Sequence, residues 1–220
     1  MAEVEANCAE EMQVPRVSGR RAAYLERRRA TTRGAILSAA RQIFADASYG
    51  DAKIEDIIRT AAVSRATFYA HFASKFELAC AIYDEIAPQT AALFVRLSGL
   101  KRDDRTGIRH WLDDFVGIHL EHRQVTSLIA QLQLFERSFR ARILHDAEAL
   151  IDLVAATEGT GFGRAKGSGA AARLQRARVR LLFNRVAMLC AEVARGELSP
   201  EDADISLDLV SEEIAQFLAA

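Results

Sequence analysis

Proline is scarce in this chain of 220 residues and occurs only as Pro15, Pro88 and Pro200. Proline inside a helix removes a backbone hydrogen bond and clashes with the preceding turn, so a chain with few prolines leaves long stretches free to form helices. Alanine, which has the highest intrinsic helix propensity, is abundant. These two features favour an all-helical (all-α) fold.

Long apolar runs and a secretory signal are also missing. No apolar run approaches the roughly 20 residues that cross a bilayer. The first residues, among them Glu3, Glu5 and Glu10, are acidic, whereas a secretory signal has basic residues followed by an apolar stretch. We therefore expect a cytoplasmic protein that does not contact a membrane.

Only three cysteines occur, Cys8, Cys80 and Cys190, and no two of them form a Cys-x-x-Cys pair. An odd number without such a pair argues against a disulfide framework. Cys80 and Cys190 lie in apolar helical stretches, where cysteine packs as a small hydrophobic residue. A redox-sensing role is the alternative.

The net charge of −1 hides an uneven distribution of charge along the chain. Residues 1–15 carry four acidic residues and no basic one, whereas residues 16–79 carry 12 Lys and Arg against 6 Asp and Glu. Residues 80–220 carry 17 basic against 20 acidic residues. A basic N-terminal third suggests that this part meets a polyanion such as a nucleic acid, while a solvated basic face is the alternative.

The N-terminal residues 1–30 lack hydrophobic periodicity and end in a basic stretch. We expect a mostly flexible basic arm there, with a short helix near residues 22–29 as an alternative. Such arms follow the phosphate backbone of DNA or enter its minor groove. A disordered tail is the other interpretation.

Three short helices are expected next. Thr32 is a suitable N-cap for the first, which should end near residues 48–50. The second covers residues 54–61, and Ser64 is a good N-cap for a third that ends at Phe72. Helices this short must pack on one another, because helix nucleation is costly.

The rest of the chain has the pattern of longer helices. Ser74 can cap a fourth helix, which Pro88 should end or kink. Five glycines between residues 159 and 169 indicate a flexible linker, and neither a strand before them nor Gly-Lys-Ser/Thr after them supports a phosphate loop. Further helices are expected at residues 89–100, 106–123, 125–156 with a break near 138–143, 170–195 and 203–218.

Short helices joined by a tight turn between the second and the third form a helix-turn-helix. In this motif the first helix of the pair braces the backbone, and the second lies in the major groove of DNA. The specific signal here is the run Val63-Ser64-Arg65-Ala66-Thr67-Phe68-Tyr69-Ala70-His71-Phe72, followed by Ser74-Lys75.

With this run, the sequence resembles the TetR family of bacterial transcriptional regulators over residues 32–84. The segments Ile36-Leu37-Ser38-Ala39-Ala40 and Ile54 to Ile58 also match. The resemblance implies a DNA-binding domain at residues 31–80, after the flexible basic arm of residues 1–30, and a ligand-binding and dimerisation domain at 81–220. It further implies a homodimer in which a small molecule, bound in the body, changes the separation of the two heads.

The sequence departs from the family pattern at three positions. Ala62 occupies a turn position usually held by glycine, and a positive φ there would cost roughly 1 kcal/mol. Ser48 stands where a glycine usually follows the first helix. Lys53 replaces a capping Thr or Ser before the second helix, so the cap is expected to shift to Asp51 while Lys53 meets a phosphate.

The candidate DNA-binding residues come from this motif and its basic surroundings. Arg65 suits a bidentate contact to guanine, whereas Tyr69 and His71 resemble the family's phosphate-contacting pair, with capping or packing as the alternative. Lys75 would meet a phosphate at the start of the fourth helix. The full set is Arg33, Lys53, Ser64, Arg65, Ala66, Thr67, Tyr69, His71 and Lys75.

The body offers an apolar set of candidate ligand-binding residues, with ordinary core as the alternative. His119 belongs to this set and shares a helix face with His122, but no third or fourth ligand supports a metal site. The candidate pocket residues are Phe94, Trp111, Phe115, His119, Leu132, Phe135 and Phe183.

The last two expected helices carry broad apolar faces, which suit a four-helix bundle with a second subunit, or alternatively the internal core. The candidate dimer residues are Leu182, Val186, Leu189, Val193, Leu207, Val210, Ile214 and Phe217.

These observations predict a ligand-responsive, dimeric transcriptional repressor that binds double-stranded operator DNA and is released by a small-molecule effector. Activation instead of repression stays open. The competing hypothesis is an all-helical enzyme or ligand carrier, but no Gly-x-Ser-x-Gly or His-Glu-x-x-His motif occurs. We expect no catalytic residue, metal or cofactor.

Overall fold

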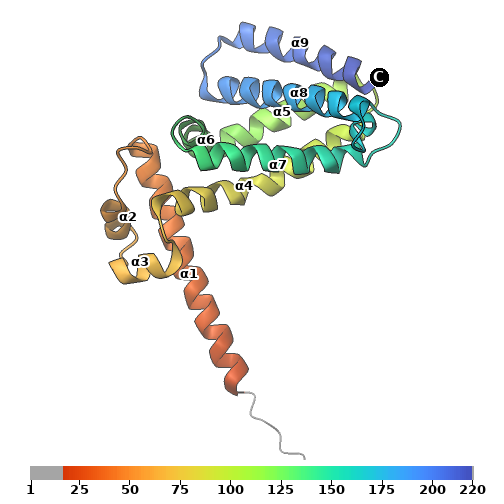
Figure 1. Cartoon of the computed structure of the whole chain (residues 1–220). Coiled ribbons are helices and arrows are strands. Elements are labelled where there is room, and N and C mark those ends of the chain that lie inside the picture. Colours follow the sequence, from red (N-terminus) through yellow and green to blue (C-terminus); the bar gives the residue numbers. More distant parts are fainter. Residues whose placement is uncertain (1–16, 220) are drawn as a thin grey trace, which may run out of the picture.

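Helices make up all the regular secondary structure between residues 17 and 219, the part of the chain that the computed structural model describes (Figure 1). The all-helical fold class is therefore confirmed. No helix in this range is long and apolar enough to cross a membrane. In chain order the elements are α1 (Val17–Asp46), α2 (Ile54–Thr60), α3 (Arg65–His71), α4 (Lys75–Ser98), α5 (Arg105–Glu121), α6 (Arg123–Phe135), α7 (Arg137–Ala155), the 3-10 turn η1 (Gly163–Ala165), α8 (Ala170–Arg195) and α9 (Pro200–Ala219).

The helices α1, α2 and α3 form a head at one end of the molecule (Figure 1). Because α2 and α3 have seven residues each, they depend on packing for their stability. Ile57 of α2 and Phe68 of α3 are fully buried, and they pack in one cluster with Ile36 and Phe44 of α1. Burying these large apolar side chains fixes the short helices on the long one.

Serine side chains begin both α3 and α4, as the sequence predicts. The Ser64 hydroxyl accepts a hydrogen bond from the backbone N–H of Thr67 at 3.0 Å, and the Ser74 hydroxyl accepts one from Glu77 at 3.1 Å. Each bond satisfies a backbone donor that the first turn of a helix leaves free.

The start of α2 differs from the prediction, because Asp51 does not cap it. Lys53 is the N-cap residue and its side chain makes no capping bond. The Asp51 carboxylate instead accepts a hydrogen bond from the Ser48 hydroxyl at 2.6 Å. Two carboxylates in the first turn, Glu55 and Asp56, complement the helix dipole in place of a cap.

The turn between α2 and α3 requires a left-handed residue, and Ala62 supplies it with φ +53°. It is the only non-glycine residue with positive φ between residues 17 and 219. The sequence position usually held by glycine therefore does adopt the strained conformation.

Two helices are longer than the sequence predicts. α1 begins at Val17 and not after Thr32, whose hydroxyl donates to the carbonyl of Arg28 at 3.0 Å inside the helix. Residues 17–30 of the expected flexible arm are thus helical, while residues 1–16 lie outside the described part. α4 runs through Pro88 without ending there, because buried residues on both sides of the proline, Ile86 and Leu93 among them, anchor the helix.

The expected flexible linker between α7 and α8 is instead packed into the body. Phe162, in the middle of the glycines, is fully buried and belongs to the body core. The buried Gln175 amide donates to the carbonyl of Gly161 at 2.8 Å. Glycine at position 161 allows this close approach, since a Cβ there would overlap the carbonyl oxygen of Phe217.

The buried residues form two clusters. One lies among α4, α5, α7, α8 and α9. The other holds the head together but also includes Val125, Leu128 and Leu132 of α6 and Phe139 of α7. The head therefore shares its core with the body and does not stand apart from it.

Candidate nucleic-acid interface and effector site

The third helix of the head presents one face to its core and the other to solvent. Phe68 and Phe72 are buried, whereas Arg65 and Ala66 are exposed and Tyr69 is 42% exposed. This separation follows from helical spacing, because residues three or four apart share a face. Thr67 is half-buried, and its hydroxyl lies 2.8 Å from that of Ser64.

Arg65 is held in place by two neighbours. Its guanidinium donates to the Glu55 carboxylate of α2 at 2.8 Å and lies over the Tyr69 ring, 5.5 Å from the centroid. The hydrogen bond with Glu55 is the main reason that the pKa of Arg65 is raised. The sequence analysis did not identify Glu55 as a partner of Arg65. The only indication was an acidic residue next to a basic motif.

The C-terminal end of α3 lies beside positive charge. Burial, followed by the nearby charges of Arg29 and Arg33, lowers the pKa of His71 below its ordinary value. The Arg33 guanidinium lies 4.9 Å from the centre of the Phe72 ring. A phosphate at this point would meet an imidazole and two arginines together.

Lys75, which the sequence places against a phosphate, instead turns toward the protein. Its ammonium donates to the backbone carbonyls of Tyr49 at 2.6 Å, Ala52 at 2.9 Å and Gly50 at 3.3 Å. These three acceptors match the three hydrogens of an ammonium group. Lys75 thus fastens the loop between α1 and α2, while Lys53 is exposed at the start of α2.

Tyr49 connects the head to the body. Its backbone N–H donates to the Gln131 side chain of α6 at 2.6 Å, and its hydroxyl donates to Glu136 at 3.0 Å. Burial, the hydrogen bond and the charge of Glu136 together raise the pKa of Tyr49 well above its ordinary value. The same ring lies under the Lys75 ammonium, 4.6 Å from its centroid, so one side chain links α4 with the region where α6 meets α7.

Five of the seven candidate pocket residues come together in the body. Phe94 lies at the centre, with its ring centroid 4.3 Å from that of Phe183 and 5.2 Å from those of Trp111 and Phe115. The Trp111 indole donates to the carbonyl of Leu93 at 2.7 Å. We call Phe94, Trp111, Phe115 and Phe183 the aromatic cluster.

His119 lies at one end of the aromatic cluster, with its ring 4.9 Å from that of Phe115. Its Nδ1 lies 3.0 Å from the Thr126 hydroxyl, whereas its buried Nε2 has no hydrogen-bond partner among the described residues. Burial is the main cause that lowers the pKa of His119 to about 4, so the imidazole is neutral at physiological pH.

The other two candidate pocket residues lie elsewhere. Leu132 is buried in the cluster that holds the head, and Phe135 is 70% exposed at the end of α6. Sequence reasoning missed Phe162, whose ring lies 5.8 Å from that of Phe183. Its position among glycines suggested a linker and gave no sign of burial.

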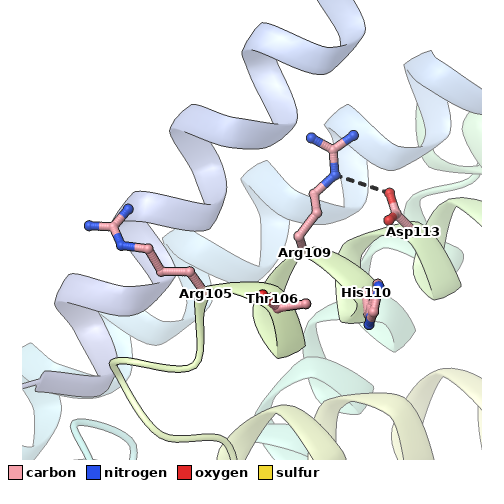
Figure 2. Close-up of a pocket in the computed structure, with 5 residues that line it drawn as sticks. All are labelled: Arg105, Thr106, Arg109, His110 and Asp113. Atoms are coloured by element: carbon pink, nitrogen blue, oxygen red, sulfur yellow. Dashed lines mark hydrogen bonds and ion pairs between the residues drawn. The ribbon is translucent and has the colours of Figure 1, made fainter.

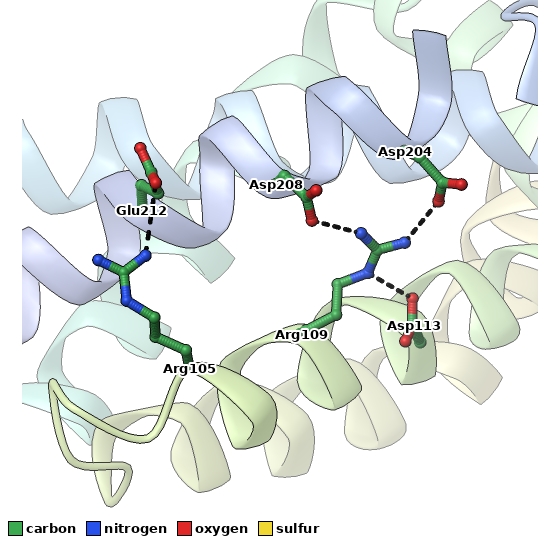
Figure 3. A network of polar contacts seen from close by, with 6 residues as sticks. All are labelled: Arg105, Arg109, Asp113, Asp204, Asp208 and Glu212. Carbon is green, nitrogen blue, oxygen red and sulfur yellow. Dashed lines mark hydrogen bonds and ion pairs between the residues drawn. The ribbon is translucent and has the colours of Figure 1, made fainter. Parts of the chain in front are cut away.

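An open hollow of about 460 Å³ lies on the outer side of α5 (Figure 2). Arg109 lines it, but its guanidinium already donates to Asp113 at 3.1 Å, Asp208 at 2.6 Å and Asp204 at 2.7 Å (Figure 3). These bonds, with Arg105 and Glu212 beside them, tie α5 to α9. A cation neutralised by three carboxylates does not attract an anionic ligand.

The candidate dimer residues pack within their own chain. All except Val193 and Phe217 are buried, and those two pack against the body core. The opposite face of α8 carries three exposed apolar side chains, Leu174, Leu181 and Met188, at intervals of seven residues. On α9, Ile205 and Leu209 are exposed in the same way.

The head meets the structural definition of a DNA-binding helix-turn-helix protein. A capped helix exposes one face, and a tight turn joins it to a bracing helix. Residues 36–82, from α1 to α4, match the family model described as "Bacterial regulatory proteins, tetR family". The head of this chain is therefore a DNA-binding domain of the TetR type, the domain found in bacterial regulatory proteins.

Solved structures share its fold over most of the chain. A TetR-like transcriptional regulator from Rhodococcus is 22% identical, with 85% of this chain and 94% of that chain covered and a TM-score of 0.58. NalD, the secondary repressor of the MexAB-OprM multidrug efflux pump in Pseudomonas aeruginosa, is 21% identical, with 86% and 96% covered and a TM-score of 0.58. No curated protein sequence matches the chain.

Proposed function

We propose that this regulator is a repressor released from its operator by a small apolar or amphipathic effector that binds in the aromatic cluster beside His119. The unpartnered, buried Nε2 of His119 is the observation that carries this proposal. A buried polar atom without a partner costs roughly 1–3 kcal/mol. An effector that combines an apolar ring with one hydroxyl would recover that cost, because the ring would replace aromatic contacts and the hydroxyl would reach Nε2.

The entrance to this site lies between α4 and α5. A hollow of about 470 Å³ there is lined by Leu93, Ile118, Arg96 and Asp114 among others. Leu93 and Ile118 are chain neighbours of Phe94 and His119, and the ion pair between Arg96 and Asp114 bridges the two helices. Separation of that exposed pair costs little, because exposed ion pairs contribute at most about 1 kcal/mol, so the pair itself would not keep an effector out.

The signal would reach the head through Tyr49. An effector that displaces Phe115 or His119 on α5 also displaces α6, because Thr126 of α6 lies beside the His119 ring. Gln131 and Glu136 would then move relative to Tyr49, which lies in the loop before α2 and whose carbonyl accepts a hydrogen bond from Lys75. The effector acts by favouring the arrangement in which the heads no longer match the operator.

On the DNA side, Arg65, Ala66 and Thr67 would face base edges in the major groove. The remaining candidates, Arg33, Lys53, Ser64, Tyr69 and His71, would contact phosphates and set the register. Lys75 would support these contacts through the loop between α1 and α2.

The proposed homodimer pairs α8 and α9 of one protomer with those of a second copy. Seven residues are two helical turns, so Leu174, Leu181 and Met188 form one exposed apolar stripe on α8, while Ile205 and Leu209 are exposed on α9. Residues 31–80 would act as the DNA-binding domain and residues 81–220 as the body that binds the effector and the partner.

A matched pair of probes tests the effector site. Trp111 is the only tryptophan, so its fluorescence reports on the aromatic cluster. We expect 1-naphthol to change this fluorescence and to weaken operator binding in a fluorescence-anisotropy assay, with naphthalene, which lacks the hydroxyl, binding at least tenfold more weakly. The variant His119→Phe should bind both probes equally, and an unchanged preference for naphthol in this variant would remove His119 from the site.

The double variant Arg65→Ala and Tyr69→Ala distinguishes a regulator from a ligand carrier. A regulator loses specific operator binding in a gel-shift assay but keeps the Trp111 response to naphthol. If this variant shifts the operator as the unchanged protein does, the assignment of α3 as the reading helix is wrong.

The variant Tyr49→Phe tests the route between the two sites. It should keep operator affinity within about threefold, since the ring and its contact with Lys75 remain, but naphthol should release it less effectively. Full release of this variant by naphthol would show that the hydroxyl bond to Glu136 does not carry the signal.

A further inference from the structure

The first half of α1 projects beyond the head as a basic helix. Every side chain from residue 19 to residue 31 is exposed. Residues 17–33, here called the basic extension, contain a single acidic residue, Glu26. Its arginines are Arg20, Arg21, Arg27, Arg28, Arg29 and Arg33.

The basic extension leaves the head beside the end of the reading helix. Arg33 lies over Phe72, and the charges of Arg29 and Arg33 act on His71, the last residue of α3. From there, residues 17–28 continue for about 18 Å, at about 1.5 Å per residue. α1 runs past α3 and away from the body (Figure 1). A duplex that receives α3 in its major groove therefore lies next to this helix.

The charge of the basic extension is unbalanced among the described residues. No arginine of the basic extension forms an ion pair with another described residue, whereas many arginines of the body do. Arg20 and Arg27 are two turns apart and share one face, Arg21 and Arg28 share a second, and Arg29 lies on a third. Whatever the rotation of the helix, arginines would face an adjacent strand of DNA.

A partner would stabilise the basic extension. It continues a helix that is anchored in the head, but a segment that is exposed on all sides gains no stability of its own from packing. An adjacent row of phosphates would supply the missing interaction, because arginine forms charge-assisted, bidentate hydrogen bonds with phosphate oxygens. An anionic membrane would satisfy the charge equally well, but it would not lie next to α3.

We propose that the basic extension is a second DNA-contacting surface, which binds the phosphate backbone outside the half-site read by α3. This proposal rests on the DNA-binding function of the head and widens its footprint on the DNA. The contacts are independent of sequence, so they add affinity without changing which operator is chosen.

The test compares salt dependence on two duplexes. The operator is first selected from random duplexes by the full chain, and then prepared both trimmed to the two half-sites and with ten flanking base pairs on each side. The test variant changes Arg20, Arg21, Arg27 and Arg28 to Gln, which leaves the arginines that touch the head in place. A control variant changes four exposed arginines of the body that form no ion pair among the described residues, Arg102, Arg123, Arg137 and Arg164, to Gln.

On the flanked duplex we expect the test variant to bind at least tenfold more weakly than the unchanged protein at low salt. Its plot of log affinity against log salt concentration should be less steep, by about 0.9 for each phosphate that the variant no longer neutralises. The control variant should have the affinity and the salt slope of the unchanged protein. The test variant should keep the unchanged protein's ratio of operator affinity to scrambled-DNA affinity.

Two results would overturn the inference. One is an unchanged salt slope for the test variant on the flanked duplex, and the other is an equal loss of affinity on the trimmed duplex, where no flanking phosphates exist. Failure of the unchanged protein to select any operator would instead contradict the proposed function. Circular dichroism and Trp111 fluorescence of both variants exclude misfolding as a cause.

Discussion

At the scale of the residue, Ala62 holds a left-handed conformation that its methyl group opposes. Its φ of +53° is available to glycine without strain. We expect Ala62→Gly to raise the free energy of unfolding by about 1 kcal/mol, since the left-handed region costs a non-glycine residue about 1–2 kcal/mol and glycine returns part of this through its flexible unfolded state. Urea unfolding measures the difference.

The neighbouring position provides the control for that variant. Ala61 ends α2 with an ordinary φ of −74°. There the change Ala61→Gly should lower the free energy of unfolding by about 0.5–1 kcal/mol, because only the entropic cost of glycine remains. If both variants change the free energy of unfolding in the same direction, backbone strain at Ala62 does not explain the effect of Ala62→Gly.

The second prediction at this scale concerns pH. His119 has a folded-state pKa of about 4, below the ordinary value of 6.5. The unfolded chain therefore binds the proton more readily, and the stabilising contribution is fully present above pH 6.5 and is lost as pH falls toward 4. Between pH 7 and pH 5 the free energy of unfolding should fall by about 2 kcal/mol from this residue alone.

The variant His119→Leu measures this contribution by difference. Its unfolding free energy should depend less on pH over the same interval, whatever the other titrating groups contribute to both proteins. Parallel curves for the two proteins would show that the imidazole is not buried as the structure has it.

At the scale of the element, the glycine-rich segment before α8 behaves as part of the core. A methyl group at Gly161 would overlap the Phe217 carbonyl, so backbone must move to admit it. We expect Gly161→Ala to lower the free energy of unfolding by about 1–3 kcal/mol. Gly169→Ala, in the same segment but with open space around it, should change it by less than about 0.5 kcal/mol.

Thermal unfolding of these two alanine variants checks the prediction. For a chain of this size, each kcal/mol corresponds to roughly 2–4 °C in Tm. Equal Tm values for the two variants would contradict the packing at Gly161 and would indicate a flexible linker.

At the scale of the whole molecule, the exposed stripe on α8 should govern assembly. Leu181 and Met188 are 65% and 66% exposed and lie two turns apart. Placing carboxylates there by Leu181→Glu and Met188→Glu would bury like charges against each other in a two-fold interface, so we expect a monomer in sedimentation velocity. Operator binding should then weaken by at least a hundredfold, since one head alone reads one half-site.

Leu120→Glu is the matched control for that change, because Leu120 is also exposed but lies on α5. It should leave the sedimentation coefficient unchanged. A dimer that survives the α8 substitutions would place the interface elsewhere.

The sequence by itself determined the features that depend on local chemistry. Few prolines and many alanines predicted helices, Ser64 and Ser74 predicted the starts of α3 and α4, and the run from Val63 to Phe72 predicted the extent of α3. The turn position of Ala62 was also visible in the sequence. Caps, turns and motif spacing act within a few residues, so the sequence states them directly.

Tertiary structure decided what depends on distant neighbours. Pro88 stays inside α4 because buried side chains on both sides hold the helix, and the glycines around Phe162 close over the body core instead of forming a linker. Lys75 binds loop carbonyls 23 to 26 residues away in sequence. Which apolar face of α8 turns inward was likewise set by packing against other helices, because periodicity fixes the spacing of a face but not its direction.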